Sequence, residues 1–232
     1  MATSSNGSDR PLRSFGRTGG RPLSPRRAAL IQDRLPGLII PTDREVSPSE
    51  LFGFEPAELW LEIGFGGGEH LSHQAKANPQ AAIIGAEPFV EGQAKLVAEL
   101  ESQGLENVRI HPGDIREILS LWPEQSLDRV FILFPDPWPK QRHRKRRLVQ
   151  PEFLCGVSRK LKPGARVRFA TDIADYAEQA LAVFLNDGRF AWSAQTATDW
   201  RDEPPDHFTT RYQSKKLGDC EPVFLDFRFQ AG

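Results

Sequence analysis

The feature that most constrains the fold is the regular alternation of short apolar runs with amphipathic segments from residue 59 onward. Apolar runs predict strands at 59–63, 82–86, 108–110, 128–134, 165–170 and 223–229. Segments with helical spacing separate most of them, at 69–77, 90–103, 151–161 and 173–185. Strands that alternate with helices form a mostly parallel sheet through right-handed crossovers. We therefore predict a doubly wound α/β fold with helices on both faces of the sheet.

The N-terminal end has a different composition. Residues 1–25 are rich in Ser, Gly, Pro and Arg, which favours a disordered basic arm over a packed segment. Residues 1–34 hold seven arginines against two aspartates, although the whole chain has a net charge of −1. Residues 26–35 predict a short helix, followed by a proline-rich lead-in. We expect 26–232 to form one domain, since 232 residues suffice for a single α/β core.

Composition also excludes several classes of protein. The longest apolar runs are far shorter than the roughly 20 residues that cross a bilayer, and no apolar signal segment follows the first charges. The two cysteines, Cys155 and Cys220, stand in no metal-ligand spacing, so we predict that they are reduced and buried and that no metal site is present. These features indicate a cytoplasmic protein without a membrane partner.

A glycine-rich turn follows the first strand, in Gly64-Phe-Gly-Gly-Gly68. Glycines allow the backbone to turn sharply and to approach a ligand closely. A dinucleotide fingerprint needs a further glycine at position 69, where Glu69 stands instead, and its carboxylate would repel a pyrophosphate. No Gly-Lys-Ser/Thr follows, so a P-loop is excluded as well. The turn therefore favours a cofactor without phosphate groups.

Acidic residues occur at the ends of three successive strands. Glu62 lies beside the glycine turn, where it can receive a cationic amino group. Glu87 follows the second strand, 23 residues beyond Gly64, where an acid accepts hydrogen bonds from a ribose diol. Asp114 follows the third strand and is placed to accept from an adenine amino group. A glycine turn followed by such acids resembles the class I S-adenosylmethionine-dependent methyltransferases.

The segment after the fourth strand is the most specific in the chain. Pro135, Pro137 and Pro139 stiffen a loop that carries Asp136 and Trp138. Six cations follow within eight residues, an arrangement that favours a polyanionic partner beside the predicted cofactor edge. We predict that this run contacts an RNA backbone, through Lys140, Arg142, Arg144, Lys145, Arg146 and Arg147.

Taken together, the motifs resemble the bacterial tRNA (guanine-N7-)-methyltransferases. Pro135-Asp-Pro-Trp138 and the basic run are similar to that family's Pro-Asp-Pro-Trp signature and its Lys- and Arg-rich stretch. Thr171-Asp172 is similar to the family's Thr-Asp pair, and Thr210-Arg-Tyr-Gln213 to its Thr-Lys-Phe-Glu. The likeness covers about residues 58–230. It implies a Rossmann-like, mostly parallel seven-stranded sheet of the class I methyltransferase type, and tRNA and S-adenosylmethionine as partner and cofactor.

The resemblance also implies roles for individual residues. The S-adenosylmethionine site would contain Glu62, Gly64, Gly66, Glu87, Asp114 and Asp136, and the substrate contacts would be Lys140, Asp172, Thr210, Arg211, Tyr212 and Gln213. Gln213 departs from the family, whose residue there is Glu, and the change removes a charge. The family acts on the variable-loop guanine, nucleotide 46 in tRNA numbering. A monomer and a homodimer are both compatible with it, and no obligatory protein partner is expected.

The chemistry requires no general base, because guanine N7 carries a lone pair and no hydrogen. Catalysis then rests on positioning and electrostatics. We expect Asp136 to be the catalytic residue, gripping the N1/N2 edge of guanine, with Asp172 sharing the task. Either Tyr212 or Trp138 offers a stacking surface, and for Trp138 core packing is the alternative. Two other functions remain open: a methyltransferase acting on another RNA, a protein or a small molecule, and an RNA-binding scaffold on a degenerate methyltransferase fold.

Overall fold

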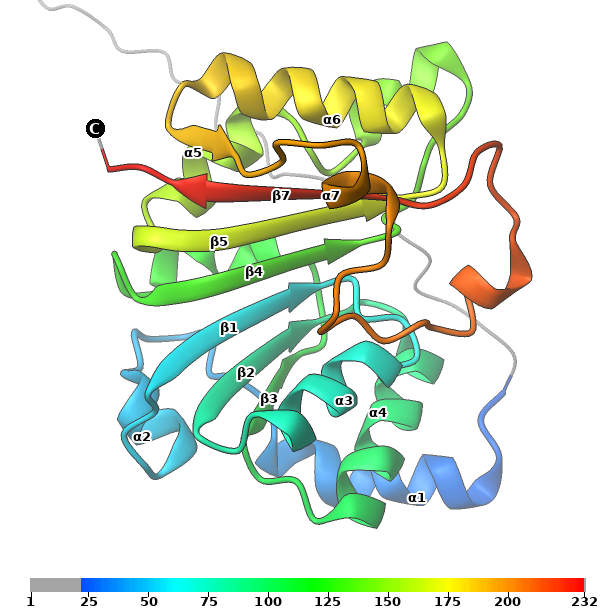
Figure 1. The fold of residues 1–232 in the computed structure, drawn as a ribbon. Coiled ribbons are helices and arrows are strands. Elements are labelled where there is room, and N and C mark those ends of the chain that lie inside the picture. Colours follow the sequence, from blue (N-terminus) through cyan, green and yellow to red (C-terminus); the bar gives the residue numbers. More distant parts are fainter. Residues whose placement is uncertain (1–21, 232) are drawn as a thin grey trace, which may run out of the picture.

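The computed structural model describes residues 22–231, and its centre is a seven-stranded sheet (Figure 1). The strand order is β3-β2-β1-β4-β5-β7-β6. The strands are β1 (Glu58–Ile63), β2 (Ala81–Ala86), β3 (Val108–His111), β4 (Leu127–Leu133), β5 (Leu161–Thr171), β6 (Phe190–Trp192) and β7 (Val223–Phe229). The basic arm predicted for 1–25 lies, up to residue 21, outside the described residues.

The pairing confirms the predicted doubly wound, mostly parallel sheet. Strands β1 to β5 pair in parallel, and β7 runs antiparallel between β5 and β6. Six of the seven strands were located from the sequence. The missing one, β6, has three residues and lies at the sheet edge, so it is too short to show an alternating pattern.

Helices cover both faces of this sheet, as Figure 1 shows. Those of four residues or more are α1 (Pro25–Arg34), α2 (Pro48–Phe52), α3 (Glu69–Ala77), α4 (Val90–Gln103), α5 (Pro151–Ser158), α6 (Ala174–Asp187) and α7 (Thr198–Arg201). Single 3₁₀ turns occur at Leu35–Gly37, Ile115–Glu117, Leu119–Leu121 and Gln213–Lys215, and a longer one at Gln141–Arg146. α4 ends at a glycine C-cap: Gly104 adopts φ 63°, and its N–H bonds back to the last turn of the helix.

Two apolar cores hold the layers together. Alternate residues of β1 belong to opposite cores: Leu59, Leu61 and Ile63 pack toward α5 and α6, whereas Trp60 packs toward α3 and α4. Because both faces of the central strands are covered, β1 and β2 are buried along almost their whole length. The sheet is therefore a rigid frame whose strand ends position the loops.

Two sequence expectations concern the surface. Among the described residues, none of the helices combines the length and apolar character needed to traverse a bilayer. The prediction of buried cysteines is wrong for Cys155, which α5 turns toward solvent, while Cys220 is half-buried. The strand order reverses between β1 and β4, so the carboxyl ends of β1, β2 and β4 open onto one crevice.

Candidate active site

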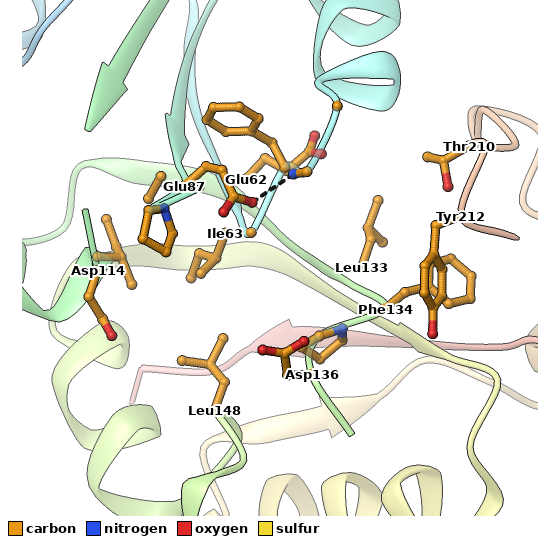
Figure 2. Close-up of a pocket in the computed structure, with 18 of the residues that line it drawn as sticks. Glu62, Ile63, Glu87, Asp114, Leu133, Phe134, Asp136, Leu148, Thr210 and Tyr212 are labelled. Atoms are coloured by element: carbon orange, nitrogen blue, oxygen red, sulfur yellow. Dashed lines mark hydrogen bonds between the residues drawn. The ribbon is translucent and has the colours of Figure 1, made fainter. Parts of the chain in front are cut away.

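A cavity of about 660 Å³ opens at the carboxyl ends of β1, β2 and β4. Figure 2 shows side chains from these strand ends and from the segment around Tyr212 converging on it. It brings together most of the residues that the sequence singled out: Glu62, Gly64, Gly66, Glu87, Asp114, Asp136, Trp138, Arg146, Thr210, Arg211 and Tyr212. We call this space the main cavity.

The glycine turn forms one wall of the main cavity. Gly64 and Gly66 adopt φ values of 74° and 54°, in the left-handed region that favours glycine. A Cβ added at either position would meet no protein atom, so both face open space where a ligand can approach the backbone. Gly92 of α4 supports the turn from behind, since a Cβ there would lie 2.1 Å from the Gly66 carbonyl oxygen. The sequence did not single out Gly92, whose need for a missing side chain arises only from this packing.

Glu87 is tied to the glycine turn. Its carboxylate accepts hydrogen bonds from the Gly66 N–H (2.8 Å) and from the Phe89 N–H (2.9 Å). Burial raises the pKa of Glu87 above its ordinary value, and the nearby carboxylates of Asp136 and Glu62 raise it further. Glu87 thus orders the turn while one side of its carboxylate remains at the cavity wall.

Glu62 is buried and held by a histidine. Its Oε2 lies 2.7 Å from Nδ1 of His70, in the first turn of α3. The side-chain amide nitrogen of Gln74 lies 3.2 Å from Nε2 of His70 and donates to it. With Nε2 accepting from Gln74, the ring hydrogen of His70 is on Nδ1, which donates a hydrogen bond to Glu62. His70 was not predicted, because a histidine in the first turn of a helix gives no signal in the sequence.

Asp114 forms an ion pair that the sequence analysis missed. Its carboxylate accepts from the backbone N–H of Arg116 (3.0 Å) and from Nε of the same residue (2.8 Å). A third contact joins Oδ2 of Asp114 to Nη2 of Arg116. Both residues line the main cavity. An arginine two positions after a candidate acid is a signal that could have been used.

The Asp136 loop follows β4 with an unusual backbone. Phe134 and Trp138, on either side of Asp136, adopt φ values of 49° and 43°, which are rare for non-glycine residues. Such conformations cost about 1–3 kcal/mol each and persist only where the surroundings hold them. Pro135 and Pro137 fix the intervening turns, and the Phe134 N–H donates to the Ala170 carbonyl (2.8 Å). Partial desolvation in the cavity wall raises the pKa of Asp136.

Arg147 anchors the Asp136 loop from inside the protein. Its predicted role as an RNA contact is therefore wrong in this structure. The side chain is fully buried, with its guanidinium 4.6 Å from the centre of the Tyr176 ring. It donates to the Pro137 carbonyl (2.7 Å), to Asp175 (2.7 Å) and to Gln179 (2.7 Å). A fully buried cation that donates to these partners inside the protein is out of reach of a phosphate.

The other cations of the run follow two patterns. Arg144 pairs with Asp175, and the Arg146 guanidinium lies 5.0 Å from the centre of the Trp138 ring, at the edge of the main cavity. Lys140, Arg142 and Lys145 are exposed along the 3₁₀ turn and its N-cap. Lys140 is therefore on the surface beside the main cavity and does not line it.

The segment from Asp202 to Lys216 closes the other side of the main cavity. Asp206 bridges two buried arginines of the sheet, with Oδ1 2.7 Å from Arg168 and Oδ2 in contact with Arg129. The Arg211 N–H donates to Glu69 (2.7 Å), and the two side chains form an ion pair at 3.0 Å. These contacts anchor the segment that carries Thr210 and Tyr212.

Tyr212 packs against Phe134, at the start of the Asp136 loop, in the wall of the main cavity. Its ring centre lies 5.7 Å from that of Phe134, and the ring is tilted by 46° relative to it. Burial raises the pKa of the Tyr212 hydroxyl, and the carboxylates of Asp172 and Asp136 raise it further. The hydroxyl is therefore near both predicted substrate-binding acids and stays protonated at neutral pH.

Two predicted substrate residues lie in a neighbouring cavity of about 430 Å³. Asp172 is buried there and accepts two backbone hydrogen bonds, from Asp219 and Cys220, at its carbonyl. Gln213 is buried as well: its side-chain oxygen accepts from Nε2 of His207 (2.8 Å), and its amide donates to Glu203. Asp172 and Gln213 thus line this neighbouring cavity and not the main one, although Asp172 remains near enough to Tyr212 to raise the pKa of its hydroxyl.

The arrangement has a clear chemical preference. Carboxylates at three strand ends offer hydrogen-bond acceptors and negative charge, which suit a ligand with hydroxyl, amino and cationic groups. Apolar side chains, including Ile63, Leu133 and Leu148, form the wall between these acids and Asp136. At the glycine turn, where Glu62 and Glu87 lie, these acceptors suit hydroxyl and amino groups better than a pyrophosphate.

Comparison with known proteins gives a consistent result. A family model described as a putative methyltransferase matches residues 56–223. A tRNA (guanine-N(7)-)-methyltransferase of Hyphomonas neptunium is 53% identical over 221 residues, covering 94% of this chain and 100% of the relative. A protein of the same name from Caulobacter vibrioides strain NA1000 is 55% identical over 217 residues, covering 94% of this chain and 95% of the relative.

Solved structures share the fold at low identity. The 16S rRNA methyltransferase KamB superposes with a TM-score of 0.56 at 17% identity, covering 81% of this chain and 96% of that one. A 16S rRNA (adenine(1408)-N(1))-methyltransferase from Catenulisporales acidiphilia, solved with its cosubstrate SAM, gives a TM-score of 0.55 at 16% identity, covering 81% and 93%. These likenesses confirm the predicted methyltransferase type of α/β fold.

Proposed function

Since this chain belongs to the tRNA (guanine-N(7)-)-methyltransferase family, we propose that it transfers a methyl group from S-adenosylmethionine to N7 of a guanine in tRNA. The observation that carries the proposal is that Glu87 and Asp136 line one cavity, near enough for Asp136 to raise the pKa of Glu87. An acid for the cofactor and an acid for the purine therefore face a shared space.

The residues of the main cavity fit S-adenosylmethionine. Gly64 and Gly66 leave space at the backbone, and the acids Glu62, Glu87 and Asp114 match its amino group, ribose diol and adenine amino group in turn. Arg116 donates three hydrogen bonds to the Asp114 carboxylate and holds it at the cavity wall. When bound, this cofactor supplies an electrophilic methyl group on a sulfonium, which guanine N7 attacks directly.

Asp136 is the residue that we assign to catalysis. A carboxylate accepts hydrogen bonds from N1–H and from the N2 amino group of guanine, which positions the base. Its negative charge also offsets the positive charge that the purine ring gains when N7 is alkylated. The stiff backbone on both sides of Asp136 supports this role, because a fixed carboxylate need not reorganise during the reaction.

For the stacking surface we favour Tyr212 over Trp138. The guanidinium of Arg146 covers the Trp138 ring, whereas the Tyr212 ring lines the main cavity beside Phe134. Thr210, two residues earlier, offers a hydroxyl to the same space. Three exposed cations of the basic run beside the main cavity suit the tRNA backbone: Lys140, Arg142 and Lys145.

The finer parts of the proposal are the position of the base and the setting. We propose the variable-loop guanine, nucleotide 46, as the target, and action in the cytoplasm as a monomer or homodimer without an obligatory protein partner. The exposed cations flanking the cavity support a folded RNA over a small molecule as the substrate.

The test is methylation of an unmodified tRNA transcript by the purified protein, followed by borohydride and aniline scission, which cuts at N7-methylguanosine. We expect one new cut, at nucleotide 46. A matched transcript with 7-deazaguanosine at that position lacks the nucleophilic nitrogen and should remain uncut. Transfer of labelled methyl groups to protein extract but not to tRNA would replace the proposal with the protein-methyltransferase alternative.

A further inference from the structure

A second groove, of about 530 Å³, borders the main cavity on the side of α3 and α4. Its walls come from α1, α3, α4 and the segment around Phe208, which Figure 1 shows running past the start of α3. The groove and the main cavity share Gly67, Glu69, Lys95 and Arg211 as lining residues. A chain that enters the main cavity can therefore continue into this groove. We call it the α3/α4 groove.

Positive charge dominates the α3/α4 groove. Four cations line it against two carboxylates: Arg27, Lys76, Lys95 and Arg211 against Glu69 and Glu99. Lys95 pairs with Glu91 at 3.2 Å and Arg211 with Glu69 at 3.0 Å. Within residues 22–231, neither Arg27 nor Lys76 has a carboxylate at ion-pair distance. The groove thus offers two cations that a polyanion can bind without breaking an existing pair.

A pair of flat rings stands beside these cations. Phe208 is 39% exposed, and its ring stacks on that of His73 with centres 4.8 Å apart and planes 26° apart. Phe208 lines the α3/α4 groove together with its cations. Aromatic faces next to cations are the combination that binds unstacked bases of single-stranded nucleic acid.

The direction of the chain adds a third observation. α1 begins at Pro25, and Arg27 on its first turn lines the groove. The sequence that leads into this helix carries Arg10, Arg13, Arg17 and Arg21, so a strongly basic segment is joined to the structure at this edge. Because that segment and the groove have the same sign of charge, the segment is a poor occupant of the groove. An external polyanion suits both.

We propose that the α3/α4 groove binds the tRNA strand next to the target guanine, with its phosphates on Lys76 and Arg27 and one unstacked base on Phe208. This inference rests on the proposed function and extends it. It assigns the substrate a second contact surface, separate from the basic run at 140–147. Flipping a base into the main cavity leaves its neighbours unstacked, and an aromatic face beside the cavity compensates for that loss.

The experiment measures tRNA binding apart from methyl transfer. Filter binding of full-length protein to tRNA, at several salt concentrations, is compared for the wild type, Lys76→Glu and Phe208→Leu. Leucine retains the apolar packing against His73 but removes the π face. Arg159→Glu is the matched control, since Arg159 is exposed just before the amino end of β5, at the opposite end of the parallel strands from the main cavity. Binding of S-adenosylmethionine by each variant reports whether the cofactor site is intact.

We expect Lys76→Glu to weaken tRNA binding about tenfold and to reduce the salt slope by about one. Phe208→Leu should weaken binding at least about fivefold with the slope unchanged. Both variants should bind S-adenosylmethionine like the wild type and reach the wild-type single-turnover rate at saturating tRNA. Arg159→Glu should change none of these values by more than about twofold.

Two results would overturn the inference. One is wild-type tRNA affinity in both groove variants, which leaves the groove without an RNA role. The other is an equal loss of tRNA and cofactor binding, which means that the substitutions act on the whole domain. Failure of the proposed function looks different, because the wild type would then bind or ignore tRNA without producing N7-methylguanosine.

Discussion

The two halves of the main cavity are built in different ways. The cofactor half, at the ends of β1 to β3, uses partners close in sequence: Glu87 and Gly66 are 21 positions apart, and Asp114 and Arg116 are two apart. The substrate half, around Asp136 and Tyr212, is anchored over long distances. Arg211 reaches Glu69 across 142 positions, and Asp206 reaches Arg129 across 77.

This difference predicts how the two halves respond to change. Local contacts form wherever the strand and its turn form, so the cofactor half should survive damage to the segment 202–216. Long-range anchors fix a loop only when the whole sheet is in place, so the substrate half should be the more easily disturbed. Substitutions in each half should therefore alter different measured quantities: cofactor affinity on one side, and methyl-transfer rate or tRNA affinity on the other.

The largest effect is expected at Asp136. Asp136→Asn keeps the size of the side chain but removes the charge that balances the methylated ring, so the single-turnover rate should fall about a thousandfold. The raised pKa of Asp136 adds a pH dependence: the wild-type rate should fall, as the pH drops, at a pH above the ordinary range of an aspartate. The measurement is methyl transfer at saturating tRNA and cofactor.

The division into a cofactor half and a substrate half would be contradicted if Asp136→Asn weakened S-adenosylmethionine binding by the same factor as it slowed methyl transfer. Asp136 would then belong to the cofactor half of the cavity. Asp136→Glu is the control for position, because it restores the charge one methylene away; recovery of less than about a tenth of the rate would indicate that placement matters as much as charge.

Arg147 tests the anchoring of the substrate half. Arg147→Ala leaves Asp175 and the Pro137 carbonyl without their buried donor, and the unfolding free energy should fall by about 3 kcal/mol.

Arg147→Lys keeps the charge but loses the planar guanidinium that reaches three partners, so it should slow methyl transfer with a smaller loss of stability. Urea unfolding measures the first effect and single-turnover kinetics the second. An unchanged tRNA salt slope in Arg147→Ala would agree with the burial of Arg147, whereas a slope reduced by one would restore the predicted phosphate contact.

Arg147 also illustrates what the sequence alone could provide. The sheet, its helices and the acids Glu87 and Asp114 follow from periodicity and from the rule that ligands meet strand ends, and both kinds of signal are local. Arg147 looks like its neighbours in a basic run, yet it is buried because α6 places Asp175 and Gln179 beneath it. Its burial, the support of Gly66 by Gly92 and the separation of Asp172 from Asp136 depend on packing between distant segments, which no local pattern encodes.

Glu87 tests the cofactor half. Glu87→Gln can accept only one of the two backbone hydrogen bonds and offers a weaker acceptor to a diol, so S-adenosylmethionine affinity should fall about tenfold to a hundredfold. Because burial raises the pKa of Glu87, wild-type affinity is full above that raised pKa and is lost as the pH falls through it. Calorimetric titration with the cofactor at several pH values measures both.

Glu124→Gln, at an exposed position near the start of β4, is the matched control and should bind the cofactor like the wild type. The Glu87→Gln affinity should be flat over the pH range where the wild type declines. An identical decline in both proteins would mean that another group titrates, and the assignment of Glu87 to the cofactor half would lose its support.

The smallest effect is expected at Gln213, where this chain differs from the family pattern. Gln213 accepts from His207 and donates to Glu203, so Gln213→Glu places two carboxylates against each other. Burial lowers the pKa of His207, which is therefore neutral at pH 8 and offers no compensating charge. tRNA binding should weaken about threefold at pH 8, and less at pH 6, because a neighbouring carboxylate raises the pKa of His207 toward protonation.

The double variant Glu203→Gln/Gln213→Glu restores one donor opposite one acceptor and should recover the loss. If the single variant binds tRNA more tightly at both pH values, the glutamate contacts the substrate directly, and Gln213 serves more than the internal packing of its own segment.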